Sequence, residues 1–218
     1  MMILNSKFFP RAASHLCALA AAGLLLASCA LPMPDKPERP DPYDLGPSLA
    51  LPADDPGGLP LGLDTIQAPA SIDSTRIMYR LLYAGSGQQP RPYARARWVM
   101  PPAQLLTQRL RQALSASHPV LDVGSGLAAV ELHIELDEFS QQFTSAQDSE
   151  AVVRLRAIAV APGARQQRLL GQRSFEVRHP APSADAQGGA QALGAASDAV
   201  VTQLADWLEQ LLRSGFPG

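Results

Sequence analysis

Twelve consecutive residues without a charge, Leu16 to Ala27, lie near the start of the chain, and Cys29 follows them two positions later. Lys7 and Arg11 give the segment before this run a positive charge. A bilayer-spanning helix needs about 20 apolar residues, so the run is too short to be one, whereas its length is typical of the apolar core of an export signal. We therefore predict that residues 1–28 are a signal peptide and that only the chain from Cys29 onward has to fold.

The cleavage site itself predicts a lipid anchor. Leu26-Ala27-Ser28-Cys29 combines an aliphatic residue, two small residues and a cysteine, and so resembles the bacterial lipobox, whose cysteine becomes the acylated N-terminus. An ordinary cleavage site with a chance cysteine is the alternative. The other cysteine, Cys17, would leave with the peptide, so the mature chain would have no disulfide. Several acyl chains, at about 0.8 kcal/mol per buried methylene, give stable anchoring, and Cys29 is the predicted lipid-attachment site.

Two further features bear on where the anchored chain resides. In such lipoproteins an aspartate directly after the cysteine favours retention in the inner membrane, and this chain has Ala30 there. The expected location is therefore the outer membrane, with the domain facing the periplasm. Loss of Lys7 and Arg11 leaves 16 basic residues against 20 acidic ones, a net charge of −4. The arginines are scattered, so no nucleic-acid partner is expected.

Residues 29–60 are predicted to be a Pro-rich tether. Nine prolines fall between Ala30 and Pro60, and such a density favours extended polyproline II over helix or central strand. At about 3.1 Å per residue, the first dozen residues would hold the domain roughly 35 Å from the bilayer. A disordered spacer with no length requirement is the alternative. The folded domain is predicted to cover residues 61–214.

Two-residue alternation predicts the strands. It is strict from Val130 to Leu136, where glutamates 131 and 135 share the polar face. A partner strand over residues 153–159 carries arginines 154 and 156 on its outer face, so antiparallel pairing could set these charges against the glutamates, each pair contributing roughly 0.2 to 1 kcal/mol. Further strands are predicted over residues 76–83, 93–98 and 169–177.

Two helices are predicted from the 3.6-residue period. The first begins at Pro101-Pro102 and ends before His118-Pro119, with Leu106, Leu110 and Leu114 on one face. The second covers residues 193–211, and its apolar stripe must be covered either by its own sheet or by a partner helix. The predicted fold is α+β, an antiparallel sheet with two helices packed on one face.

Residues that could carry chemistry do not form a recognisable site. His118, His133 and His179 lie far apart and lack metal-ligand spacing; His133 is expected on a solvated strand face and the other two in loops. Ser125 and Ser86 each stand between glycines, but neither pattern is the G-x-S-x-G elbow of a hydrolase, so both are interpreted as turns. The adjacent carboxylates of residues 137 and 138 should point to opposite faces of a strand. We expect no catalytic residue, no cofactor and no metal site, and hence no enzyme.

Several short motifs occur in an order that resembles a known family. They are Tyr43-Asp44-Leu45, Ile77-Met78-Tyr79-Arg80, Arg97-Trp98 before the proline-started helix, Phe175, and Ala205-Asp206-Trp207-Leu208. The chain resembles the ABC-type transport auxiliary lipoproteins, which include the paraquat-inducible lipoprotein that accompanies an MCE-domain transport protein. The resemblance spans nearly the whole mature chain and places the family-like start near Tyr43, although Pro42 stands where the family usually has a second aromatic residue.

The resemblance implies a non-enzymatic part of an envelope transport system that moves lipids or other hydrophobic molecules. Its partners would be an MCE-domain protein and ABC transporter subunits, with an ATPase and a permease supplying energy at the inner membrane, while the lipoprotein itself binds no nucleotide. A structural or assembly lipoprotein for an outer-membrane complex is the alternative function. The sequence leaves open whether the chain forms a homo-oligomer and whether a groove under the C-terminal helix binds lipid.

Overall fold

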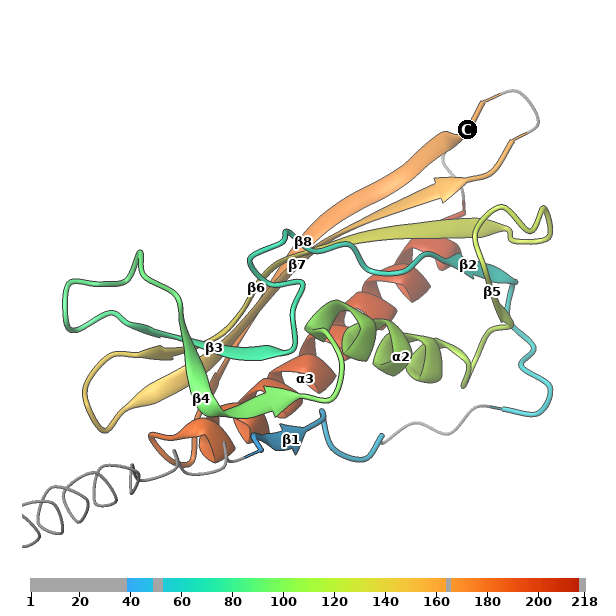
Figure 1. The fold of residues 1–218 in the computed structure, drawn as a ribbon. Coiled ribbons are helices and arrows are strands. Elements are labelled where there is room, and N and C mark those ends of the chain that lie inside the picture. The colour runs from blue at the N-terminus through green and yellow to red at the C-terminus, as the bar shows by residue number, and fades with distance from the viewer. Residues whose placement is uncertain (1–38, 49–52, 164–165, 216–218) are drawn as a thin grey trace, which may run out of the picture. The chain divides into compact units, whose positions relative to one another are not determined.

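The computed structural model describes residues 39–48, 53–163 and 166–215, and Figure 1 shows how their helices and strands are arranged. The predicted signal peptide and Cys29 lie outside these residues. The elements in chain order are β1 (Asp41–Tyr43), β2 (Leu61–Leu63), β3 (Arg76–Leu81), β4 (Arg91–Trp98), α2 (Pro102–Leu114), β5 (Val120–Leu121), β6 (Val130–Phe143), β7 (Ser149–Ala161), β8 (Arg168–Pro180) and α3 (Ala186–Arg213).

The 14-residue strand β6 organises the sheet. β7 pairs along almost the whole length of one of its sides, and β8 follows β7. On the other side of β6 two strands share the edge, β2 at its start and β3 at its end. β4 and then β1 extend the sheet beyond β3, and β5 extends it beyond β2. The long central strand therefore holds together two groups of short strands.

The α+β class is confirmed, but the prediction of an antiparallel sheet was wrong, because the sheet has eight strands of mixed direction and most of its pairings in the described residues are parallel. Four of seven pairings are parallel, namely β1 with β4, β2 with β5, β2 with β6, and β3 with β6. Alternation identifies the two faces of a strand but carries no information on the direction of its neighbours. Strands of two or three residues, such as β5 and β1, are also too short to show alternation.

The antiparallel pairing of β6 with β7 agrees with the sequence analysis, but only one of the two expected charge pairs forms. Glu135 is opposite Arg156, and the two side chains form an ion pair. Glu131 is opposite Val160 instead, and it is buried, with one carboxylate oxygen accepting the amide proton of Gly124 at 2.8 Å. Both glutamates pair in the same antiparallel register. Because they are four residues apart, whereas arginines 154 and 156 are two apart, one register cannot set both charge pairs.

Both helices lie on one side of the sheet and share one hydrophobic core with it (Figure 1). The apolar stripe of α3 is covered by the chain's own sheet: Leu193 and Val200 are fully buried, and the rings of Trp207 and Phe175 meet edge to face at 5.9 Å. α2 packs beside α3 and presents Leu106 to the same core. Of the two alternatives for the stripe, the structure therefore supports packing within the domain.

α3 begins seven residues earlier than predicted, because two glycines in its first turn conceal the start. A side chain at Gly189 would place its Cβ only 2.0 Å from Oε1 of Gln141, so glycine there allows the helix to approach β6. Asp185 caps the helix, and its carboxylate accepts the amide proton of Gly188 at 2.8 Å. The sequence signal for this start is the cap, since Asp is a favoured N-cap residue.

Replacing Asp185 with alanine should lower the free energy of unfolding by about 1 kcal/mol at neutral pH. The amide of Gly188, followed by the hydroxyl of Ser183, holds the pKa of Asp185 below its ordinary value. A lowered folded-state pKa stabilises the fold above the unfolded-state pKa, and this contribution disappears as the pH falls through the folded-state value. Urea unfolding of both proteins should therefore show a difference near pH 7 that shrinks at acid pH. An equal difference at both pH values would contradict this role of the carboxylate.

Candidate functional site

The structure shows how the chain that leads from the predicted anchor joins the domain, although Cys29 itself lies outside the described residues. β1 runs parallel to β4, and the carbonyl of Tyr43 accepts the amide proton of Val99 at 2.8 Å. Leu45 follows and is buried in the core. Residues 41–45 fall within the range predicted to be tether, 29–60, so part of that range lies in the sheet and core.

Arg109 on α2 binds the segment after β1. Its guanidinium donates to three consecutive carbonyl oxygens, those of Leu45 at 2.8 Å, Gly46 at 2.7 Å and Pro47 at 2.8 Å. The same group lies 3.2 Å from a carboxylate oxygen of Asp198 on α3. We call this set of contacts the Arg109 latch. It ties the entering chain to both helices at one point.

The charged groups of the Arg109 latch are largely withdrawn from water, which strengthens their interaction. The Arg109 side chain is 7% exposed, whereas Asp198 is 32% exposed. Desolvation raises the pKa of Asp198, and the Arg109 charge acts in the opposite direction. A planar guanidinium has five N–H donors in a fixed fork, so one buried arginine can satisfy several carbonyls that would otherwise lose their hydrogen bonds to water.

A groove of about 610 Å³ lies between this entering segment and the first half of α3. Its α3 side consists of one helical stripe that includes Gln187, Gln191, Gly194 and Asp198. Gly194 permits a close approach, because a Cβ there would be 3.0 Å from the carbonyl oxygen of Leu45. Apolar side chains from both sides of the groove complete the lining, including Pro42, Tyr43, Pro47, Val99, Ala190 and Ala195.

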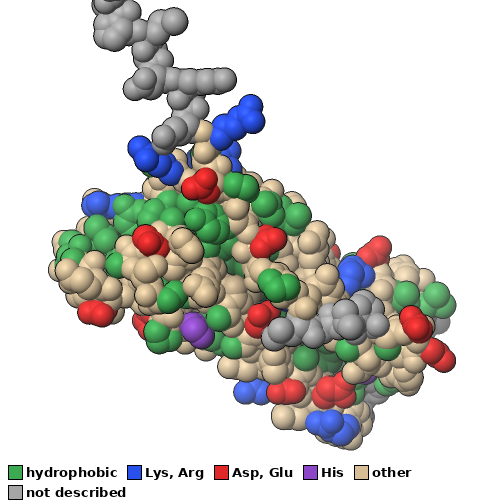
Figure 2. All heavy atoms as spheres, turned by 90° about the horizontal axis from the view of Figure 1, so that it is seen from below, with side chains coloured by type: hydrophobic (Ala, Val, Ile, Leu, Met, Phe, Trp, Pro, Cys, Tyr) green, Lys and Arg blue, Asp and Glu red, His purple; other side chains and the backbone are tan. Residues whose placement is uncertain are grey.

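The chemistry of the groove suits an apolar or extended polypeptide ligand better than an anionic one. Among the lining residues that the structure describes, none is a lysine, arginine or histidine, and Asp44 and Asp198 give the rim a negative character. Figure 2 shows hydrophobic side chains gathered in a band on this face of the molecule, with charged side chains scattered around it. Such a surface lacks the cations that bind phosphate or carboxylate groups.

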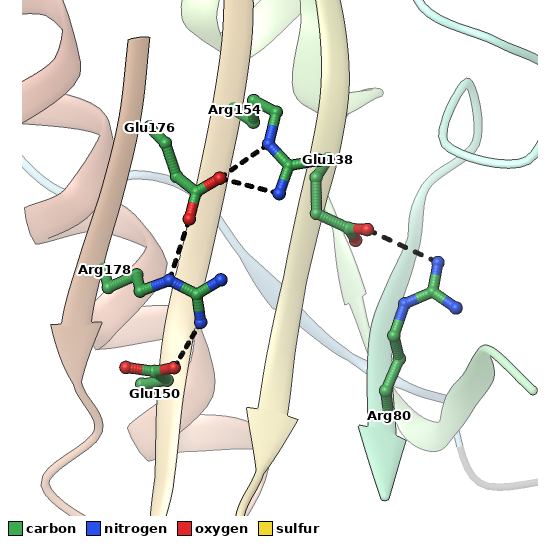
Figure 3. A network of polar contacts seen from close by, with 6 residues as sticks. All are labelled: Arg80, Glu138, Glu150, Arg154, Glu176 and Arg178. Atoms are coloured by element: carbon green, nitrogen blue, oxygen red, sulfur yellow. Dashed lines mark hydrogen bonds and ion pairs between the residues drawn. The ribbon is translucent and has the colours of Figure 1, made fainter. Parts of the chain in front are cut away.

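The face of the sheet that points away from the two helices carries a ladder of ion pairs across four strands (Figure 3). Arg178 bonds both Glu176 at 2.8 Å and Glu150 at 2.6 Å, and Glu176 also binds Arg154 at 2.6 Å. These arginines hold the pKa of Glu176 below its usual value. Exposed pairs of this kind contribute about 0–1 kcal/mol each, so we interpret the ladder as a solvated face rather than a site of chemistry.

The three histidines are dispersed, and His179 differs from expectation. His133 is 39% exposed, as a solvated strand face predicts, with Asp64 at 3.4 Å. His118 follows α2 in a turn, yet it is buried, with Nε2 2.6 Å from Glu209 and Nδ1 3.0 Å from the carbonyl oxygen of Leu59. His179 was expected in a loop but is in β8.

The remaining candidates from the sequence have structural roles. Gly124 and Gly126 flank Ser125 with positive φ angles of 76° and 73°, which confirms a turn. Glu138 binds Arg80 at 3.4 Å on the charged face. Within residues 39–48, 53–163 and 166–215 no cluster of three or more His, Cys, Asp or Glu side chains could hold a metal ion. In the same part of the chain no helix is long and apolar enough to cross a membrane.

The family with the description ABC-type transport auxiliary lipoprotein component matches residues 43–205. The chain belongs to this family. The match starts at Tyr43, the position that the sequence resemblance indicated, and it includes the Arg109 latch, most of the groove and every strand from β2 to β8. As a family member, the protein is an auxiliary lipoprotein component of an ABC-type transport system, and it is membrane-anchored. None of the curated proteins matches the chain.

Solved structures of other proteins show the same fold over nearly their whole length. A Xanthomonas campestris protein is 22% identical with a TM-score of 0.67, and the alignment covers 80% of this chain and 98% of that one. A hypothetical protein from Chlamydia trachomatis is 6% identical with a TM-score of 0.52, over 73% of this chain and 100% of that one. At these identities the likeness concerns the fold alone.

Arg109 and Asp198 were not among the residues predicted from the sequence to be functional, although one signal for Arg109 was present. Arg109 falls three residues after Leu106 and one before Leu110, and so lies beside the apolar face of a predicted helix. A cation at such a position is rarely buried without a partner. The sequence offered no means of naming that partner, because three of the groups that Arg109 binds are backbone carbonyls.

Proposed function

We propose that this auxiliary lipoprotein is anchored in the outer membrane through Cys29 and acts without catalysis as the periplasmic docking component of an MCE-type system that moves lipids or other hydrophobic molecules. The anchor and its location come from the lipobox and Ala30. Family membership supports the association with an ABC-type transporter. The MCE-domain partner and the class of substrate come from the resemblance described above.

The observation that carries this proposal is the Arg109 latch. A lipid anchor can position a domain only if the chain between them is fixed to the folded part, and the latch makes that connection at Leu45, Gly46 and Pro47. The chain from Cys29 to Arg39 would then set the distance from the membrane, roughly 30 Å if it is extended as polyproline II. The groove lies directly beside this point and is available for a segment of a partner protein.

The proposal is tested by isolating the crosslinked lipoprotein from bacterial envelopes under denaturing conditions and identifying the attached proteins by mass spectrometry. We expect an MCE-domain protein and at least one ABC transporter subunit, and less of either when bulk is introduced into the groove by Ala195→Trp. Gln172→Trp, on the exposed part of β8 and outside the groove, is the matched control. Recovery of neither component would refute the proposal, and recovery of an outer-membrane assembly complex instead would support the structural alternative.

A further inference from the structure

β8 is a long strand with one open edge. It covers 13 residues and pairs with β7, and within the described part of the chain no other strand pairs with it. In Figure 1 it forms the outer margin of the sheet. Gln172, Ser174, Glu176 and Arg178 are all exposed along it. An edge of this length is a template for strand addition unless something blocks it.

The register shows which backbone groups the edge offers. The amide of Ala181 donates to the carbonyl of Ser149 at 2.9 Å, and pairs in an antiparallel ladder alternate between bonded and non-bonded. Two and four residues earlier, His179 and Val177 must therefore also bond to β7. The even-numbered residues beside them, Glu176 and Arg178, direct their N–H and C=O groups away from β7.

We propose that this edge binds the β8 strand of a second copy of the chain, antiparallel, with a two-fold axis at Val177. This register sets Glu176 of each copy opposite Arg178 of the other, so the edge is complementary to itself in charge. In this register Ser174 of each copy also faces Pro180 of the other. The pairs of Glu176 with Arg178 and of Ser174 with Pro180 together form about six backbone hydrogen bonds between the two copies. The ion-pair ladder of Figure 3, which ends at Glu176 and Arg178 on the edge, would continue across the axis into the second sheet.

Charge and backbone chemistry select this register over its neighbour. A shift that moves the axis to Glu176 would place two glutamates directly opposite each other, which is destabilising, whereas opposite charges at such positions contribute roughly 0.2 to 1 kcal/mol per pair. Pro180 has no N–H to donate and ends the regular ladder. The second copy is available on the same membrane surface, since both copies carry the anchor.

A cysteine crosslink tests the proposal on the full lipoprotein in its membrane. Cys17 leaves with the signal peptide and Cys29 is acylated, so the mature chain offers no other thiol. Val177→Cys places one thiol on the axis, where facing Cα atoms of a non-bonded pair are about 4.5 Å apart. Mild oxidation should convert most of this variant into a dimer on a non-reducing gel. Gln172→Cys is the matched control, because its two copies would be roughly 33 Å apart.

A charge swap distinguishes the proposed register from chance encounters. Adding Glu176→Lys to Val177→Cys sets like charges across the axis and should lower the dimer fraction at least fivefold. Further addition of Arg178→Glu restores opposite charges and should restore the dimer. Equal crosslinking of Val177→Cys and Gln172→Cys would overturn the proposal, as would a crosslinked band that contains a different protein. Membrane-bound amounts of each variant, measured on a reducing gel, establish that it is folded and exported.

Discussion

Replacing Cys29 with serine is expected to release the protein from the membrane and to disable the transport system, while the domain stays folded. The expected loss of anchoring is close to complete, because each acyl chain contributes about 0.8 kcal/mol per buried methylene and the variant has no acyl chain. The variant should carry an ordinary cleavable signal so that export is unchanged. Membrane fractionation measures its release, and complementation of a deletion strain measures function.

Cys17→Ser is the matched control for this experiment, because it removes the other cysteine, which lies in the segment predicted to be lost on export. It should leave both anchoring and complementation unchanged. Full complementation by the soluble Cys29→Ser protein would refute the docking role, since a domain that diffuses freely could not connect a membrane to a transporter. Continued membrane attachment of the variant would refute Cys29 as the lipid-attachment site.

Replacing Arg109 with methionine is expected to lower the free energy of unfolding by about 3 kcal/mol. Methionine keeps much of the apolar stem of Arg109. Asp198 then loses its cation, and the carbonyl oxygens of residues 45–47 lose their hydrogen-bond donor. Breaking a buried ion pair lowers the free energy of unfolding by about 3–5 kcal/mol. We expect the lower end of this range, because the Asp198 side chain is 32% exposed and can be hydrated when Arg109 is absent. Denaturant unfolding measures the change, and limited proteolysis should show faster cleavage near Gly46.

Arg111→Met on the same helix is the matched control. Arg111 binds Asp122, whose side chain is 88% exposed, so its loss should cost no more than about 0.5 kcal/mol. Arg109→Lys keeps the charge but has a compact ammonium group in place of the planar fork, and its stability should fall between that of the wild type and Arg109→Met. A loss below about 1 kcal/mol for Arg109→Met, with unchanged proteolysis, would show that the latch does not hold the entering segment.

The central antiparallel strands and both helices were predictable because their signals are local. The alternation from Val130 to Leu136 marks one buried face, and all four of its apolar side chains are buried in the structure. α2 begins at Pro102, where proline is favoured in a first turn. The register of β6 on β7 was less predictable, because the shift after Leu136 moves every later pair by one residue. Arg154 binds Glu176, the residue opposite it on β8.

By itself the sequence determined the candidate anchor, the family, the α+β class and the segments that form the core, since each depends on residues that are neighbours along the chain. Only the tertiary structure decided how the entering chain is attached. β1 is a three-residue strand whose pairing with β4 depends on residues more than fifty positions away. Arg109 binds backbone carbonyls of residues 45–47, and a carbonyl is present at every position of a sequence. The Arg109 latch therefore depends on which carbonyl groups the fold places next to the guanidinium, and this cannot be predicted from the sequence pattern.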